Sequence, residues 1–600
     1  MKKNTANREV PSRFTCHREG NILLWSVVSW LLVGFSIASG QQIWVSGQQK
    51  STIQYRMEQE ITTSEGIKEL VVSFVVPSDF SSFTYRQRIH DLKFNFSPQP
   101  THREEKTDKR GNNVQIYYWE SPATQIRAIV SFQASTQVNL NPITPGSAHF
   151  PLKEIPEDVR DYLLPTEQVQ SNHPAIQEKA QELTSDVTTL HAATMRILTW
   201  VAQHMHYVLV PEQYDALYAF NTGKGNCQNY SHLAAALLRA VGIPARIVNG
   251  ITLNKPYDIP LGESAYQFKM AQGRHSWIEV YFPEEGWLPF DPQQTEFFVS
   301  NRYLRIEVGV DNNETVQDGL VRWRQSHGSE PQTPKLEEAF ISEFLNDEVA
   351  FQGKLGDASI EKLLLSPPIQ EKLPLAAAIP PKPDEEEQPP EKSAEETPPE
   401  TEEMPEEVDY TTLNYEEPFL YGNLDFPENV NFAFPRETSQ LTKNKLTRTF
   451  LVETAEYVTG NHQYAQVFIL EEPIRLEFIG LALHNFGGSG RLWLELCEDN
   501  NGHPGPPAVR SKPVHLSELH SGQGYRWVDF DFRKEGIILS PGKYWFFLNF
   551  DGGPIVNWFY SYGKPVGPSD GTRSRKLGER EWNTILSYEF NYRVVGKASK

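Results

Sequence analysis

An acidic, proline-rich tract divides this chain and limits how it can fold. Between Pro380 and Glu407 the sequence has twelve acidic residues, eight prolines and two lysines. Such a segment lacks the apolar side chains that a core needs, so it is expected to be extended and solvated. We therefore predict a Pro/Glu-rich disordered linker over residues 366–418, with folded units on both sides. A docking segment for a basic partner is the alternative interpretation.

The length of the chain indicates how many folded units it contains, and its net charge argues against one class of partner. The chain has 600 residues, and single hydrophobic cores stop growing at about 250 to 300 residues, so several folded units are expected. The formal net charge is -21, and the tract from Pro380 to Glu407 supplies -10 of it. The folded units are therefore only mildly acidic. A negative chain repels phosphate backbones, which argues against a nucleic-acid partner.

The first 40 residues have the features of a secretion signal. Basic residues precede an uncharged apolar run from Ile22 to Ala38, and Ala38-Ser39-Gly40 offers the small side chains that signal peptidase accepts. The run is close to the lower length limit for crossing a bilayer, so residues 1–40 are interpreted as a signal peptide or an N-terminal membrane anchor. Either interpretation predicts an exported protein that is periplasmic, on the cell surface or secreted.

Cysteine usage does not favour a disulfide scaffold. Of the three cysteines, Cys16 lies in the leader, which leaves Cys227 and Cys497. These two are predicted in different domains, and we expect them not to bond to each other.

Hydrophobic periodicity assigns the remaining chain to three folded units. In residues 41–151, apolar and polar side chains alternate in short runs, and this pattern predicts an N-terminal β-domain. Residues 154–365 begin with helical spacing, continue as loop, helix and strands, and end in two stretches interpreted as helical, Leu336–Phe344 and Ile360–Leu365. In residues 419–600, apolar and polar side chains alternate regularly, and this pattern predicts a C-terminal β-sandwich. The expected fold class is multi-domain α+β.

Cys227 stands at the start of a predicted helix. The residues after it, up to Val241, repeat apolar side chains at helical spacing, and Gly242 then ends the pattern. The N-terminus of a helix presents unpaired N–H groups and a partial positive charge, which favour a nucleophilic thiolate and can hold an oxyanion. Gly223 and Gly225 allow a substrate carbonyl to approach the backbone closely. Asn221 is a candidate second oxyanion donor, with loop capping as the alternative.

A histidine and an aspartate follow on two predicted strands. His275 opens the first strand, Pro283 to Gly286 form the turn, and Asp291 ends the returning strand. Residues that lie opposite each other in a hairpin share a face. The numbers 275 and 291 have an even sum, so His275 and Asp291 share a face only if the paired residues of the hairpin also have even sums. A four-residue loop gives an odd sum, so a site that joins His275 and Asp291 requires a three- or five-residue connection or a bulge.

These motifs resemble the transglutaminase-like superfamily in its bacterial form. The matching segments are a Gly-rich turn before the cysteine, a helix end with Gly-Ile-Pro-Ala-Arg, a His-x-Trp strand and a Gly-Trp-x-x-Phe-Asp-Pro return: Gly225–Cys227, Gly242–Arg246, His275–Trp277 and Gly286–Pro292. The resemblance covers roughly residues 155–325 and implies a papain-like transglutaminase core. It also implies that Cys227 is the nucleophile, His275 the general base and Asp291 the group that orients the imidazole.

The expected function is acyl transfer or hydrolysis of peptide or glutamine amide bonds by a Cys-His-Asp triad. The alternative is a non-catalytic cell-surface binding or assembly protein that keeps this fold as a scaffold. The substrate is expected to be a protein or peptide, and no cofactor or metal site is expected. The turn Asp499–Gly502 is oxygen-rich but lacks the later glutamate of a calcium loop.

The C-terminal unit suggests a second partner. Nine aromatic residues stand between Tyr544 and Tyr562, and rings exposed on one sheet face would bind cell-surface polysaccharide or peptidoglycan by stacking. Ordinary core packing of the same rings is the alternative.

Overall fold

The computed structural model describes most of the chain after residue 40. The described residues are 41–140, 148–209, 211–293, 297–326, 333–356, 369–371, 419–422, 429–430, 449–450, 455–521, 525–561 and 572–598. The predicted signal or anchor at residues 1–40, the tract Pro380–Glu407 and the expected helical stretch Ile360–Leu365 lie outside these ranges. In the described part, no helix is long and apolar enough to cross a membrane.

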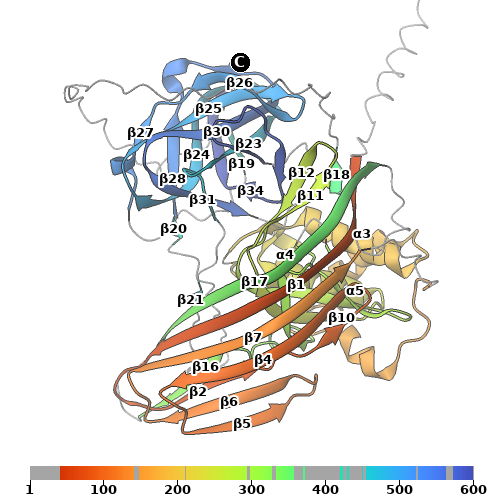
Figure 1. Cartoon of the computed structure of the whole chain (residues 1–600). Helices are drawn as coiled ribbons and strands as arrows, with labels where there is room; N and C mark the ends of the chain where they lie inside the picture. Colours follow the sequence, from red (N-terminus) through yellow and green to blue (C-terminus); the bar gives the residue numbers. More distant parts are fainter. Residues whose placement is uncertain are drawn as a thin grey trace, which may run out of the picture. The chain divides into compact units, whose positions relative to one another are not determined.

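Two sheets form the N-terminal β-sandwich. The first has the order β21-β17-β1-β7-β4-β3, and Figure 1 shows its long strands side by side as one twisted sheet. Its strands are β1 (Gln41–Thr62), β3 (Phe80–Ser81), β4 (Tyr85–Ser97), β7 (Gln125–Asn139), β17 (Lys335–Gly356) and β21 (Thr449–Phe450), and β18 (Ile369–Glu371) also pairs with β1. The second sheet is β16-β2-β6-β5, formed by β2 (Ile67–Val75), β5 (His102–Thr107), β6 (Asn113–Glu120) and β16 (Leu320–Gln325).

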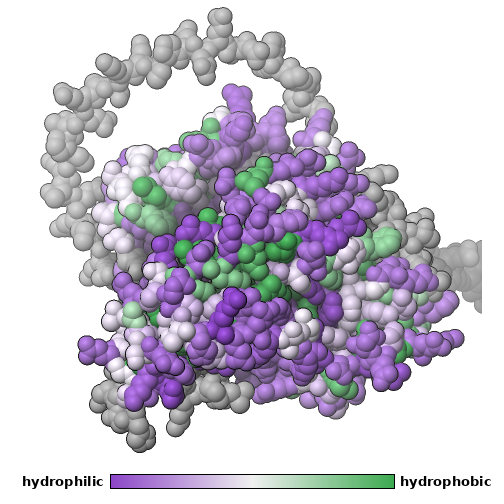
Figure 2. All heavy atoms as spheres, turned by 60° about the horizontal axis from the view of Figure 1, so that its bottom comes forward, coloured by the Kyte–Doolittle hydropathy of each residue, from purple (hydrophilic) through white to green (hydrophobic). Residues whose placement is uncertain are grey.

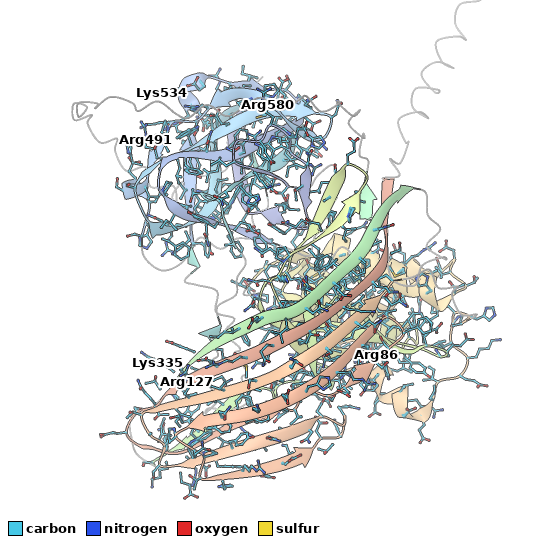
Figure 3. All side chains as sticks on the ribbon, in the orientation of Figure 1. Arg86, Arg127, Lys335, Arg491, Lys534 and Arg580 are labelled. Carbon is cyan, nitrogen blue, oxygen red and sulfur yellow. The ribbon has the colours of Figure 1, made fainter. Side chains whose placement is uncertain are left out.

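Alternating burial explains why these strands form a sandwich. Along β1, every second side chain from Gln49 to Ile61 is buried, and the intervening ones face outward. The inward side chains of both sheets form one hydrophobic cluster, which includes Tyr55, Phe74 and Trp119. Figure 3 shows basic side chains on the opposite, exposed face, among them Arg86, Arg127 and Lys335.

The expectation of a helix at Leu336–Phe344 is wrong, because this segment belongs to β17. Leu336, Phe340 and Phe344 pair with Ile61, Met57 and Ile53 of β1. A spacing of four residues fits one face of a helix and also one face of a strand, so the pattern alone does not separate them. Strands β16 and β17, which follow the central unit in sequence, complete the N-terminal sandwich.

The central unit combines helices with a four-stranded sheet of order β14-β13-β10-β15. The strands are β10 (Ala245–Thr252), β13 (Gly273–Phe282), β14 (Gly286–Phe290) and β15 (Tyr303–Gly309). The helical segments are η1 (Glu157–Leu163), α2 (Pro174–Thr184), α3 (Leu190–His204), α4 (Ala216–Thr222) and α5 (Cys227–Ala240). Two short strands, β8 (His206–Tyr207) and β9 (Lys224–Gly225), pair before α5. Helix α5 is almost entirely buried, and it contacts β10 and β13.

The C-terminal region is built from β-strands in two sheets, one of which also includes the hairpin β11–β12 of the central unit. One follows the order β11-β12-β33-β32-β23-β30-β25-β26 with β27 on β25, and the other is centred on β24 between β35 and β28. The strands are β11 (Tyr257–Leu261), β12 (Ser264–Phe268), β19 (Phe419–Gly422), β20 (Asn429–Val430), β22 (Ala455–Tyr457), β23 (His462–Leu470), β24 (Ile474–Gly487), β25 (Gly490–Asn500), β26 (His503–Arg510), β27 (Val514–His515), β28 (Tyr525–Asp531), β29 (Ile538–Leu539), β30 (Gly542–Gly552), β31 (Ile555–Ser561), β32 (Arg573–Lys576), β33 (Thr584–Leu586), β34 (Glu589–Phe590) and β35 (Tyr592–Ala598). Leu494, Phe546 and Ile479 belong to the core between the two sheets.

Most of the aromatic side chains between Tyr544 and Tyr562 are buried in the hydrophobic core. The buried rings are Trp545, Phe546, Phe547, Trp558, Phe559 and Tyr560. Because these rings are buried, they do not form an exposed stacking row, and the packing interpretation holds for them. Cys497 is also buried, and burial raises the pKa of its thiol to about 12; neither Cys227 nor Cys497 is in a disulfide.

One face of the molecule is mostly hydrophilic. Figure 2 shows a hydrophobic area near the middle of this face, bordered by hydrophilic residues. Individually exposed large apolar side chains are common on soluble proteins and need no special explanation.

Candidate active site

Cys227 is the first residue of α5, as its sequence context predicts. Asn226 caps the helix: its side-chain oxygen accepts a hydrogen bond from the N–H of Gln228 at 3.1 Å. Asn229 completes the reciprocal arrangement, since its Oδ1 accepts from the N–H of Asn226 at 3.2 Å. This capping fixes the backbone on both sides of Cys227. The sulfur lies at the positive end of the helix dipole and is partly exposed.

The hairpin that carries the histidine and the aspartate has the predicted parity. Phe282 of β13 pairs with Gly286 of β14, and Ile278 pairs with Phe290. The connection is therefore the three residues between Phe282 and Gly286, and paired residue numbers have an even sum. This confirms the expectation of a three- or five-residue connection, and it places His275 and Asp291 on one face.

His275 and Asp291 form a buried hydrogen-bonded pair. The distance between Nε2 of His275 and Oδ2 of Asp291 is 2.7 Å, and the residues are 3% and 0% exposed. The hydroxyl of Tyr303 donates to the same Oδ2 at 2.7 Å, and the N–H of Gln293 donates to Oδ1 at 2.9 Å. These contacts hold the carboxylate in place, and the carboxylate fixes the orientation of the imidazole.

Cys227 completes the group through a hydrogen bond with His275. Burial alone would lower the pKa of His275, but the adjacent Asp291 carboxylate and then the Cys227 sulfur outweigh it and raise the pKa to about 10. At neutral pH the histidine is therefore an imidazolium between a carboxylate and a sulfur. The structure brings together the three side chains that the sequence motifs single out.

A cleft lies beside Cys227 and His275. Its other lining residues include Tyr214, Asn249, Arg274, Glu307 and Asp318. Asn221, the candidate oxyanion donor, is exposed on α4 and does not line the cleft. Of the aromatic residues on the hairpin, Trp277 and Phe290 are buried core side chains, and Trp287 stacks on the guanidinium of Arg246.

Sequence reasoning missed several residues of this site. Tyr303 and Glu307 stand on β15, and no local pattern links them to Asp291 or Cys227. Asn229 had a signal, because a polar residue three positions after an N-cap residue is the spacing of a capping box.

The described residues contain no group of three or more His, Cys, Asp or Glu side chains arranged to hold a metal ion. His232 is buried, its Nδ1 lies 2.6 Å from the carbonyl of Tyr214, and burial lowers its pKa to about 4. Asp499 accepts hydrogen bonds from Gly502 N–H and from the indole of Trp545, as a structural turn does.

Comparison with known proteins identifies the family of the central unit. The model of the Transglutaminase-like superfamily matches residues 177–292, the segment that contains Cys227, His275 and Asp291. This segment is a transglutaminase-like domain. The resemblance inferred from the motifs is thereby confirmed at the level of the superfamily.

Two curated relatives share this domain over short stretches. An uncharacterized protein, YebA of Bacillus subtilis, is 40% identical over 81 residues, which are 14% of this chain and 11% of YebA. A protein-glutamine gamma-glutamyltransferase of Pseudomonas aeruginosa is 32% identical over 126 residues, which are 19% of this chain and 18% of the relative. The chain thus spans less than a fifth of the length of either relative.

Two solved structures align with part of this chain at low sequence identity. A putative cysteine protease from Cytophaga hutchinsonii covers 51% of this chain and 94% of its own, with 18% identity and a TM-score of 0.39. The periplasmic domain of TgpA from Pseudomonas aeruginosa covers 43% of this chain and 91% of its own, with 15% identity and a TM-score of 0.21.

Proposed function

We propose that the chain is a cysteine acyl-transfer enzyme that acts on peptide or glutamine side-chain amides. The observation that carries this proposal is the arrangement at the start of α5, where the partly exposed sulfur of Cys227 is hydrogen-bonded to the imidazole of His275. The imidazole in turn is held by the buried carboxylate of Asp291 at 2.7 Å. Buried titratable groups that line a cleft are enriched at functional sites, which favours an enzyme over a scaffold.

In the proposed reaction, Sγ of Cys227 attacks the carbonyl carbon of the amide and forms a tetrahedral adduct. The positive end of α5 stabilises the negative charge on the carbonyl oxygen. His275 then donates its proton to the leaving nitrogen as the C–N bond breaks, which leaves a thioester on Cys227. Asp291 keeps the imidazole oriented and stabilises its charged form.

A second nucleophile resolves the thioester. Either water or an amine attacks its carbonyl carbon, His275 accepts the proton of the nucleophile, and the sulfur leaves as a thiolate. Water gives hydrolysis, and an amine gives a new amide. We propose hydrolysis as the prevailing outcome.

The test uses the purified full chain, glutamine-containing peptides and a labelled primary amine. Ammonia or peptide fragments without incorporated label indicate hydrolysis, and incorporated label indicates transfer. The Cys227→Ala variant is the matched control and should form neither product. If the wild type releases no product and its sulfur shows ordinary thiol reactivity towards iodoacetamide at every pH, the proposal is wrong.

We also propose export for this protein. The apolar run from Ile22 to Ala38 supports it, as does the periplasmic location named for the domain of TgpA. Fractionation of cells that express the full chain, followed by detection of the chain in the extracytoplasmic fraction, tests this proposal. A peptide or protein is the proposed substrate.

A further inference from the structure

The hairpin β11–β12 of the central unit joins a sheet of the C-terminal sandwich. In the chain it is inserted between β10 and β13, two paired strands of the central sheet, and β13 carries His275. Strand β12 pairs in parallel with β33, from Ala265 opposite Thr584 to Gln267 opposite Leu586. Backbone pairing of this kind ties the inserted hairpin to the sandwich.

Contacts with the sandwich continue past the end of β12. Ser587 donates its N–H to the carbonyl of Gln267 at 3.0 Å, and its hydroxyl accepts from the N–H of Lys269 at 3.2 Å. Nζ of Lys269 lies 2.7 Å from Oε1 of Glu456, which also accepts from the hydroxyl of Tyr588 at 2.5 Å. The Lys269 and Glu456 side chains are 15% and 12% exposed, so this ion pair is less screened by water than a surface pair.

The segment that these contacts hold is one wall of the cleft. Ala271, Gln272 and Gly273 line the same cleft as Cys227 and His275. The side chain of Ala271 belongs to the hydrophobic core of the C-terminal sandwich, and a single residue separates Gly273 from His275. The sandwich therefore reaches the cleft through a short run of residues.

Two other parts of the molecule also contact this wall. The hydroxyl of Thr252 on β10 donates to the carbonyl of Ala271 at 2.7 Å, and the side-chain amide of Gln272 donates to the carbonyl of Phe340 on β17. These contacts fix the end of the wall that leads into β13. The end that follows β12 is fixed by the C-terminal sandwich, through Lys269.

We propose that the C-terminal sandwich positions the wall of the cleft formed by residues 271–273, and that Lys269 and Ser587 are positioning residues for substrate binding. The inference rests on the proposed function, because it takes the cleft as the place where the acyl donor binds. A wall held at both ends has its shape before the substrate arrives, so less free energy is lost in ordering it on binding. The competing account is ordinary packing between units, which stabilises the chain and has no effect on the cleft.

Two substitutions loosen the wall from opposite sides of the contact. Lys269→Met removes the ion pair with Glu456, and Ser587→Ala removes the acceptor of the Lys269 N–H. In the full chain, each should raise KM for a glutamine-containing peptide about tenfold and leave kcat within about twofold of the wild type, because the wall contacts the substrate in the ground state and the transition state alike. Lys269→Arg keeps a charged donor for Glu456 and should restore a KM close to the wild-type value.

Amide hydrogen exchange measures the wall without turnover. The amides of residues 269–273 should exchange about tenfold faster in Lys269→Met and Ser587→Ala than in the wild type, since the loss of these contacts favours local opening. Leu494→Ala is the matched control, because it weakens the core of the sandwich at β25, a strand that pairs with neither β12 nor β33. Below its unfolding transition it should keep the wild-type KM and the wild-type exchange of this segment.

Unchanged KM in both variants, or unchanged exchange of residues 269–273, would overturn the positioning role and leave the proposed function intact. A rise in KM that Leu494→Ala shows equally would also overturn it, since lower stability alone would then explain the rise. If the wild type gives no turnover, the proposed function fails and the positioning role fails with it.

Discussion

Three ionisable side chains meet at the start of α5, and the charge of His275 depends on the other two. Desolvation would favour a neutral imidazole at His275, yet the carboxylate of Asp291 and the sulfur of Cys227 favour the charged one. A charged imidazole supplies the proton that the leaving nitrogen needs, and it stabilises the thiolate. The proposed chemistry therefore depends on the group of three as a unit.

Substitution of Cys227 or His275 tests this unit directly. Cys227→Ala and His275→Ala should each lower kcat/KM by about 10³-fold or more, because each removes an atom that forms or breaks a bond. The double variant should be no slower than the slower single variant, since residues that act together lose their effects together. Steady-state kinetics on a glutamine-containing peptide measure this. Additive losses would show that the two residues act separately.

Asp291→Asn should shift the pH dependence of activity. The raised pKa of His275, about 10, means that its proton stabilises the folded state fully below about pH 6.5 and that this contribution is lost as pH rises towards 10. Without the carboxylate, only the Cys227 sulfur still opposes the effect of burial, so the pKa of His275 falls and the basic limb of the pH–activity profile moves to lower pH. We also expect kcat to fall by about 10² to 10⁴.

Tyr303→Phe is the control for this change, because it removes one hydrogen bond to Asp291 and keeps the carboxylate. Its basic limb should stay close to that of the wild type. A basic limb that does not move in Asp291→Asn would contradict the role assigned to this carboxylate.

At the scale of single elements, the helix start is the part on which the sulfur depends. Asn226→Ala removes the side chain that caps Gln228, which should lower the free energy of unfolding by about 1 kcal/mol and slow the alkylation of Cys227. Asn226→Ser retains a capping oxygen and should lose little of either property. Urea unfolding and the rate of alkylation by iodoacetamide measure the two effects. Equal behaviour of the Ala and Ser variants would mean that capping does not matter here.

The elements around the site were predictable because their signals are local. Helix α5 was expected from its apolar repeat and its terminal glycine, and it runs from Cys227 to Ala240. The hairpin parity followed from the geometry of a pleated strand, and it required no knowledge of the rest of the fold. Once His275 and Asp291 are taken as one site, their spacing predicts a three- or five-residue connection or a bulge, and the structure has the three-residue connection.

Elements that depend on distant partners were not predictable in the same way. The segment that begins at Leu336 becomes strand β17 because β1, far away in sequence, offers it a full row of hydrogen bonds. Tyr303 and Glu307 reach the site because β15 pairs with β10, and nothing near them in sequence signals this. No local pattern in the sequence indicates that residues after the central unit complete the N-terminal sandwich.

At the scale of the molecule, the N-terminal sandwich and the four-stranded sheet of the central unit are joined by buried hydrogen bonds. The hydroxyl of Tyr85 donates to the carbonyl of Tyr303 at 2.7 Å. The amide of Asn112 serves both the carbonyl and the N–H of Val308. Ile251 and Leu304 of this four-stranded sheet belong to the hydrophobic core of the sandwich. The sandwich thus supports β15, the strand that carries Tyr303 and Glu307.

Gln87→Ala tests whether this support reaches the site. The Gln87 side chain accepts from the N–H of Arg305 and donates to its carbonyl, both at 2.9 Å and buried. Its loss leaves two buried backbone groups without a partner, so the free energy of unfolding should fall by about 2 to 4 kcal/mol. The hydrogen bond between Tyr303 and Asp291 should loosen as β15 shifts, and kcat should fall under conditions in which the variant is still folded.

Gln133→Ala, on the outward face of β7, is the matched control and should change stability by less than about 0.5 kcal/mol. A variant that is destabilised but keeps wild-type kcat would show that the sandwich stabilises the fold without positioning the catalytic group.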